Sequence, residues 1–279
     1  MSSEVSLRAS KFSGLGNEIL LVDLIRQSGN LDSVSVKKIV EEKQAEFDQL
    51  ISLEAPTFPD LDISARIFNK DGSKAANCIN GARCVAKYAI DSDLISKKEL
   101  LVGVGEIRWR LIVHQGGDYS VEQEVPDVFK GKELLPQPNN KNLHELNVLE
   151  DTIEIGFINL ANPHGIFFTT GINGLPLDAW GKNLQTLNWF PDGINLGLAE
   201  ISSPSKVKLR VYERGVGETL SCGSGACAAV ILGNQLGLLN EEVEVKFQKG
   251  SLFVKYNEDD KKLTARGTVN FLKEINLSL

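Results

Sequence analysis

Two stretches of the chain each place a cysteine directly before a segment of small residues. Residues 78–82 read Cys-Ile-Asn-Gly-Ala, and residues 222–226 read Cys-Gly-Ser-Gly-Ala. Cys222 follows Cys78 by 144 residues (222 − 78), about half of the 279-residue chain. Each stretch runs into an apolar segment with helical character. The repeat predicts a duplicated half-molecule that contributes one cysteine from each half.

A cysteine at the start of a helix is placed for acid–base chemistry. The first backbone N–H groups of a helix have no partner within the helix, and the helix dipole adds partial positive charge there. Both effects favour an anion, and they can lower the pKa of a cysteine below its usual value of about 8.5. The neighbouring glycines and alanines let a ligand approach the backbone closely.

A pair of such cysteines suits the inversion of a stereocentre. A proton leaves one face of a carbon atom, and another proton arrives at the opposite face. We therefore expect the two cysteine loops to face one another across a cleft, with the developing enolate stabilised by preorganised donors. A redox disulfide is the weaker alternative, because it does not explain the glycines. Cys84 and Cys227, inside the helical segments, are expected to be buried apolar residues.

No cofactor or metal is indicated by the sequence. The chain has neither a P-loop nor a glycine-rich dinucleotide fingerprint between a strand and a helix. The cysteine spacings C-x5-C and C-x4-C differ from the paired C-x2-C of zinc sites. The sequence therefore predicts chemistry carried by side chains alone, with no metal.

Composition narrows the class of protein. The chain is 42% hydrophobic and 24% charged, with a net charge of −7, which argues against nucleic acid or an anionic membrane as a partner. No apolar run approaches the roughly 20 residues of a membrane helix, and the N-terminus lacks the pattern of a signal peptide. Four cysteines without a disulfide framework favour a cytoplasmic protein with reduced thiols.

Hydrophobic periodicity predicts similar elements in both halves. In the first half we expect strands at 19–25, 63–68, 107–113 and 119–125, and helices at 35–42 and 82–90. In the second half we expect strands at 152–160, 165–169, 206–213, 242–247, 251–256 and 263–271, and a helix from 225 to about 236. That last helix is apolar on nearly all sides and should be buried all round. Residues 126–151, with their prolines and asparagines, are expected to connect two domains.

The fold class predicted is α+β. We expect two pseudo-symmetric domains, each a curved, mostly antiparallel sheet or barrel around a central buried helix. The first domain would comprise residues 1–125, joined by a C-terminal strand at about 268–279. The second would comprise residues 126–267.

Other polar residues group around the second cysteine loop. Glu213 and Arg214 follow an apolar strand, and Arg is suited to bidentate binding of a carboxylate, although a surface ion pair is the simpler interpretation. Residues 162–164, Asn-Pro-His, interrupt a strand-like run as a bend facing a ligand would. Local sequence alone favours a structural role for His164.

At these residues the chain resembles the diaminopimelate epimerases, a family of cofactor-independent two-cysteine enzymes. The resemblance runs from Lys11 to near the C-terminus. The matching stretches are 14–17, 47–49, 66–69, 71–73 and 80–84 in the first half, and 162–164, 194–195, 212–219 and 221–227 in the second. This set, in this order, is highly specific. It implies an isomerase that interconverts LL- and meso-2,6-diaminopimelate at one α-carbon, in the biosynthesis of lysine and peptidoglycan precursors.

The resemblance also implies roles for individual residues. Cys78 and Cys222 would be the two acid/base residues, supported by His164 and Glu213. Contacts with the substrate would come from Asn17, Gln49, Asn69, Ile79, Asn80, Asn162, Asn195, Glu213, Arg214, Gly223 and Ser224.

The chain departs from the family pattern at several positions. Ile79 stands where glycine usually follows the first catalytic cysteine, and a β-branched residue there would disturb the pocket if the backbone needed a positive φ. The opening motif is Phe12-Ser13-Gly14, and Glu18 replaces the usual Asp. Lys273 stands where some members carry a tyrosine at a dimer contact, so the homodimer implied by the family is left open.

Two other functions stay in view. A related two-cysteine racemase of the proline or hydroxyproline type would not need Arg214 and several asparagines for a second amino-acid head group. A binding protein that kept the fold would bind an amino acid without turnover because of Ile79.

Overall fold

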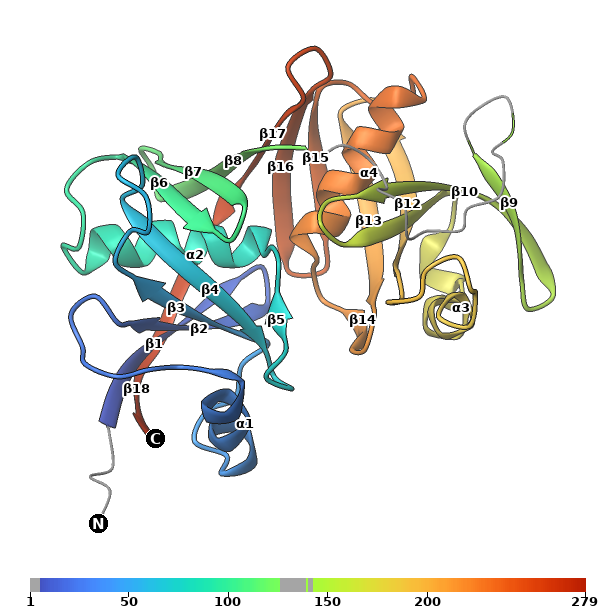
Figure 1. Ribbon diagram of the computed structural model, residues 1–279. Helices are drawn as coiled ribbons and strands as arrows, with labels where there is room; N and C mark the ends of the chain where they lie inside the picture. The colour runs from blue at the N-terminus through green and yellow to red at the C-terminus, as the bar shows by residue number, and fades with distance from the viewer. Residues whose placement is uncertain (1–5, 126–138, 140–142) are drawn as a thin grey trace. The chain divides into compact units, whose positions relative to one another are not determined.

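A computed structural model describes residues 6–125, 139 and 143–279 of the chain (Figure 1). The chain divides into two compact units. Unit 1 runs to Gln123 and also includes Arg266–Leu279, and unit 2 comprises Glu124–Ala265. Each unit is a curved, mostly antiparallel sheet with one central helix, so the architecture is α+β with two pseudo-symmetric halves, as predicted.

Unit 1 is built from antiparallel strand pairs that are joined through two parallel pairs. Its elements are β1 (Ser6–Gly14), β2 (Asn17–Asp23), α1 (Ser33–Glu41), β3 (Gln49–Glu54), β4 (Ile63–Asn69), β5 (Lys74–Ala75), α2 (Ile79–Asp91), β6 (Glu99–Val104), β7 (Ile107–Val113), β8 (Asp118–Glu124) and β18 (Asn270–Ser278). Antiparallel pairs join β18 to β1, β1 to β2, β3 to β4, β6 to β7 and β7 to β8, while β2 with β3 and β4 with β6 are parallel. The C-terminal strand thus returns to the first half of the chain.

Unit 2 repeats this order. Its elements are β9 (His144–Val148), β10 (Asp151–Asn159), β11 (Pro163–Phe168), η1 (Ile172–Gly174), α3 (Leu177–Leu184), β12 (Asn195–Ser203), β13 (Lys206–Glu213), β14 (Gly217–Thr219), α4 (Gly223–Gln235), β15 (Glu242–Phe247), β16 (Gly250–Asn257) and β17 (Lys262–Thr268). Antiparallel pairs join β10 to β11, β12 to β13 and β15 to β16, and the parallel pairs are β11 with β12 and β13 with β15.

The repeat extends to the register of the strands. In unit 1, Ile67 of β4 pairs with Ala75 of β5, and in unit 2, Val211 of β13 pairs with Thr219 of β14. Both pairs are separated by the same offset as the two cysteines. The strand pairing that precedes each cysteine is therefore repeated in both halves, although the turns differ in where the backbone has a positive φ.

The central helices differ in what surrounds them. Helix α4 is buried along nearly its whole length and contacts β10, β11, β12 and β16, because its small and apolar residues leave no polar face. Helix α2 is buried mainly in its N-terminal half and contacts β1, β2 and β7. The all-round burial predicted for residues 225 to about 236 is confirmed.

Several sequence expectations need correction. The expected connection at 126–151 contains a strand, β9, which pairs with β10; residues 126–138 and 140–142 lie outside the described residues. The expected strand 263–271 is interrupted at Val269, so that β17 and β18 are separate strands. Both central helices begin earlier than predicted, at Ile79 and Gly223.

Candidate active site

Each of the two cysteines predicted to be catalytic caps its helix through its own sulfur. Cys78 has extended backbone angles (φ −151°, ψ 98°), and its Sγ accepts the N–H of Gly81 at 3.1 Å. Cys222 has similar angles (φ −134°, ψ 112°), and its Sγ accepts the N–H of Gly225 at 3.4 Å. A side-chain acceptor at this position satisfies an N–H group that has no partner within the helix. Both sulfurs are thereby fixed beside a helix N-terminus.

The glycines of these loops provide the room for this geometry. A Cβ on Gly81 would lie 3.0 Å from the Cys78 sulfur and 2.5 Å from a methyl carbon of Ile51. A Cβ on Gly225 would meet nothing closer than 3.1 Å, and the Cys222 sulfur would be 3.5 Å away. The packing is therefore tighter at Cys78 than at Cys222.

Ile79 does not disturb the backbone of the first loop. It is the first residue of α2, is 2% exposed, and is not among the residues with a positive φ. Its backbone N–H is available from an ordinary helical conformation. Glycine geometry is therefore not needed at this position.

Three polar side chains of unit 1 lie at the same end of adjacent strands. Asn17 begins β2 and donates to Asp48 Oδ2 at 3.3 Å. Gln49 begins β3 and is the register partner of Asn69 at the end of β4. Its Nε2 donates to Asn69 Oδ1 at 3.0 Å. Asn69 in turn donates to Ser73 Oγ at 3.0 Å. The predicted substrate contacts Asn17, Gln49 and Asn69 thus form one row.

Asn80 is turned away from that row. Its side chain is 4% exposed, and its Oδ1 accepts Nη2 of the buried Arg83 at 2.5 Å. The backbone N–H of Asn80 lies in the first turn of α2.

In unit 2, the cysteine is linked to Asn162 through a hydroxyl group. Ser224 Oγ lies 3.5 Å from Cys222 Sγ and accepts Nδ2 of Asn162 at 3.4 Å. Asn162 Oδ1 is buried and has no hydrogen-bond partner among the residues that the structure describes. A buried oxygen without a partner is rare in folded proteins, and it is suited to accept a donor from a ligand.

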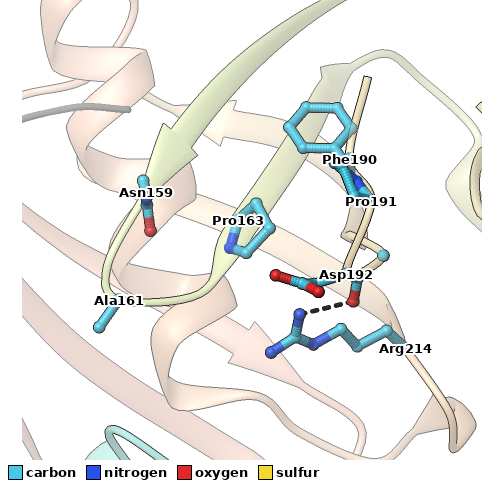
Figure 2. Close-up of a pocket in the computed structure, with 8 residues that line it drawn as sticks. Asn159, Ala161, Pro163, Phe190, Pro191, Asp192 and Arg214 are labelled. Carbon is cyan, nitrogen blue, oxygen red and sulfur yellow. Dashed lines mark hydrogen bonds between the residues drawn. The ribbon is translucent and has the colours of Figure 1, made fainter. Parts of the chain in front are cut away.

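A second group of polar residues in unit 2 holds Arg214 in place. Asn195 is 3% exposed. Its Oδ1 accepts the backbone N–H of Arg214 at 3.0 Å, and its Nδ2 lies 3.4 Å from Nε2 of His164. The Arg214 guanidinium donates to the carbonyl oxygen of Asp192 at 2.7 Å, as the dashed line in Figure 2 shows. Arg214, Asp192 and Asn159 line a pocket of about 230 Å³ that contains neither cysteine in its lining.

Burial determines the protonation of two residues near this group. The pKa of His164 is lowered to about 3, first because the side chain is fully buried and second because the charge of Arg214 disfavours an imidazolium. His164 is therefore neutral at pH 7. One ring nitrogen faces Asn195, and the other is buried with no partner in the described part of the chain, so His164 is not poised to exchange protons with solvent.

The pKa of Cys222 moves opposite to the expectation from its helix position. Burial raises it well above the ordinary value, and the negative charge of Glu213 and a hydrogen bond with that carboxylate raise it further. The Ser224 hydroxyl and the Gly225 N–H act in the other direction but do not compensate. Cys222 is consequently a thiol at pH 7.

The two remaining cysteines are structural. Cys84 and Cys227 are fully buried within α2 and α4, and burial raises the pKa of the Cys84 thiol. None of the four cysteines, all of which are described, is in a disulfide. No helix in the described ranges is long and apolar enough to cross a membrane.

Sequence reasoning missed three residues that orient the predicted ones. Asp48 accepts from Asn17, Asp192 accepts from Arg214 through its carbonyl, and the Thr219 hydroxyl donates to Glu213 Oε1 at 2.6 Å. The signal that could have found Thr219 is its place in the stretch 212–219, which carries part of the family resemblance.

Known proteins match this chain along both of its halves. The family model described as "Diaminopimelate epimerase" matches residues 9–121 and 156–272. A diaminopimelate epimerase of Teredinibacter turnerae is 34% identical over 262 residues, covering 94% of this chain and 95% of the relative. That of Nitrosomonas europaea is 33% identical over 264 residues, covering 94% and 96%.

Solved structures with lower identity share the fold. A hydroxyproline epimerase from Agrobacterium vitis has a TM-score of 0.68 at 12% identity, covering all of this chain and 94% of the other. A PhzF-family protein from Enterococcus faecalis has a TM-score of 0.67 at 11% identity, covering 98% of this chain and all of the other. At this low identity, their likeness shows the fold alone. The family model and the two relatives match both halves of the chain by sequence. The chain therefore belongs to the diaminopimelate epimerase family.

Proposed function

We propose that this protein is a diaminopimelate epimerase, a cofactor-independent isomerase that interconverts the LL and meso forms of 2,6-diaminopimelate. The observation that carries the proposal is that each half caps its central helix with a cysteine whose sulfur lies beside the N-terminal N–H groups. Family membership supplies the substrate. The reaction belongs to the biosynthesis of lysine and peptidoglycan precursors.

The proposed reaction uses one cysteine from each unit. A thiolate removes the proton from the α-carbon, the electron pair of the C–H bond moves toward the adjacent carboxylate, and the other thiol delivers its proton to the opposite face. The backbone N–H groups of residues 79, 80, 223 and 224 belong to the first turns of α2 and α4, where donors have no acceptor within the helix. We assign them to the carboxylate that accepts the developing charge.

The distal amino-acid head of the substrate is assigned to the polar row of unit 1 and to Arg214. Arg214 supplies a guanidinium that donates to the carbonyl oxygen of Asp192, and Asn195 fixes the backbone of Arg214. A guanidinium binds a carboxylate through two parallel hydrogen bonds. The buried, unpartnered Oδ1 of Asn162 offers an acceptor for an ammonium group.

These residues also support diaminopimelate over a shorter amino acid. A proline or hydroxyproline substrate has a single head group and would leave a charged Arg214 and the amides of Asn17, Gln49 and Asn69 without a ligand. The ordinary backbone of Ile79 supports turnover over the binding protein, because the N–H at this position does not require glycine geometry.

Deuterium incorporation tests the function directly. The protein is incubated under reducing conditions with LL-diaminopimelate in deuterated water, and products are followed by mass spectrometry and chiral separation. We expect one deuterium at one α-carbon as the meso isomer appears. Binding without exchange would support the binding protein, and exchange with proline or hydroxyproline in place of diaminopimelate would support the racemase.

The setting of the reaction is part of the same proposal. A reducing cytoplasm fits an enzyme that needs both thiols reduced. The family also suggests a homodimer, which size-exclusion chromatography with light scattering would test.

A further inference from the structure

The carboxylate of Glu213 is fixed by a neighbouring hydroxyl group. Glu213 ends β13 and Thr219 ends β14, the two strands of the short hairpin before Cys222. Thr219 Oγ1 donates to Glu213 Oε1 at 2.6 Å, and both residues are only partly exposed. A short hydrogen bond to a charged acceptor is among the stronger ones in proteins.

This carboxylate acts on the thiol of Cys222. Cys222 is 5% exposed, and a negative charge close to a buried thiol disfavours the thiolate. The other ionisable groups around this loop do not offset it. Arg214 directs its guanidinium at the carbonyl of Asp192, and His164 is buried and neutral.

The first half has no carboxylate at the corresponding position. The offset between the two cysteines puts Asn69 where Glu213 lies and Ala75 where Thr219 lies, and the strand register agrees. The amide of Asn69 is held between Gln49 and Ser73, and Ala75 has no hydroxyl to donate. The first turn of α2 instead carries Asn80, which accepts from the buried guanidinium of Arg83. Unit 2 places an anion at its cysteine loop, and unit 1 places a cation in the helix that its cysteine caps.

We propose that Thr219 is a positioning residue, which holds the Glu213 carboxylate beside Cys222 and so keeps the resting proton on that sulfur. The inference rests on the proposed function. Cys78 takes the α-proton and becomes a thiol, the C–H electron pair enters the enolate, and the Cys222 S–H bond breaks to protonate the opposite face. Cys222 is left as a thiolate, and proton exchange with water restores the resting form.

The test compares the variants Thr219→Val, Thr219→Ser and Glu213→Gln with the wild type. Valine keeps the shape of threonine but removes the hydroxyl, and serine keeps the hydroxyl. Each protein is alkylated with iodoacetamide across a pH series, and the labelling rate of Cys222 is measured by mass spectrometry of its peptide. Ser73→Ala in the first half is the matched control, because it removes the hydroxyl that holds Asn69.

We expect the midpoint of the Cys222 profile to fall by about one pH unit in Glu213→Gln and by roughly half a unit in Thr219→Val, because each loses part of the negative field at the sulfur. Thr219→Ser and Ser73→Ala should keep the wild-type midpoint. The pH profile of kcat/KM should shift in the same direction in Thr219→Val. A midpoint unchanged in Thr219→Val while it falls in Glu213→Gln would overturn the role of Thr219. An unchanged midpoint in both would overturn the role of the carboxylate.

The alkylation profile does not depend on turnover. If deuterium exchange with diaminopimelate fails while the Cys222 midpoint still moves, the proposed function fails and the positioning by Thr219 stands. If exchange succeeds and the midpoint does not move, the function stands and the positioning fails.

Discussion

Residues 67–82 in unit 1 and 211–226 in unit 2 share a strand pairing, and each stretch contains a cysteine that caps the following helix. The turns between the paired strands differ, with a positive φ at Gly72 in unit 1 and at Gly215 and Gly217 in unit 2. The hairpin register, the helix start and the glycine three residues after the cysteine are repeated. The side chains in these stretches are not repeated. Asn69, Ala75 and Ile79 of the first half correspond to Glu213, Thr219 and Gly223 of the second. Both sulfurs cap a helix in the same way, and the difference in the surrounding side chains is the basis of our proposal that the resting proton sits on Cys222.

Replacing each cysteine in turn separates the two roles most strongly. We expect Cys78→Ser and Cys222→Ser each to lower the rate of epimerisation by about 10²–10⁴-fold, since each removes one partner of the proton transfer. Binding of diaminopimelate, measured by calorimetry, should be largely kept. Cys222→Ser should still exchange the α-proton reached by Cys78 with deuterated water, and Cys78→Ser should lose that exchange. Equal loss of exchange in both variants would contradict unequal roles.

Lys70, which follows β4, and Arg214, which follows β13, provide a second comparison. Arg214 is assigned to the substrate, whereas Lys70, at the corresponding position, forms an ion pair with Asp48 at 3.2 Å with both side chains exposed. Loss of charged hydrogen bonds in Arg214→Gln should raise KM by about 10- to 100-fold, since such bonds contribute about 1.5–3 kcal/mol. Lys70→Gln should change KM by less than about threefold, because exposed ion pairs contribute little. Similar effects of the two substitutions on KM would remove Arg214 from the substrate site.

The paired glycines compare the packing of the two loops. Gly81→Ala would press on Ile51 and on the Cys78 sulfur, whereas Gly225→Ala meets only a slightly close methyl group of Val211. We expect Gly81→Ala to lower the free energy of unfolding by about 1–3 kcal/mol through overpacking, and Gly225→Ala to lower it less. Urea denaturation with measurement of kcat/KM checks both. A larger loss in Gly225→Ala would mean that Cys78 is not the more tightly packed cysteine.

The free energy of unfolding should depend on pH through His164, whose position in unit 1 is taken by an apolar residue. The register partner of Asn195 is His164, and the register partner of Gln49 in the first half is the apolar Ile19. The pKa of His164 is lowered to about 3 from an ordinary 6.5, so between these values the unfolded chain binds a proton that the folded chain does not. The free energy of unfolding should therefore fall as pH falls from about 6.5 toward 3, by up to about 1.4 kcal/mol per pH unit from this residue.

Urea denaturation at pH 7, 6 and 5 checks this contribution. His164→Gln removes the titrating group, so the variant should lose less stability than the wild type over this range. The same pH dependence in both proteins would show that His164 is not held neutral.

The sequence predicts both central helices because their determinants are local, although each begins two or three residues before the predicted start. A cysteine, two small residues and an apolar run indicate both the cap and the buried helix, and α2 and α4 follow them to within a few residues. The fold class follows from the repetition of strands on either side of each helix.

Other elements could not be predicted because tertiary packing determines them. Helix α3 contains Gly181, which disfavours a helix locally but is required here, since a Cβ would lie 2.1 Å from the ring of Tyr212. Strand β9 lies in a stretch rich in proline and asparagine and exists through its pairing with β10.

The protonation of the site also escapes the sequence. The helix start at Cys222 favours a lowered pKa, and burial together with Glu213 reverses the direction. The bond between Thr219 and Glu213 depends on the register of a hairpin, which no local pattern specifies.

The proposed difference in resting protonation between Cys78 and Cys222 is most directly tested on the wild-type protein. Iodoacetamide labelling of Cys78 and Cys222 is followed in one sample across a pH series, with the two peptides quantified separately by mass spectrometry. The account predicts that Cys78 is labelled with a midpoint at lower pH than Cys222. Coincident midpoints, or a lower midpoint for Cys222, would contradict it.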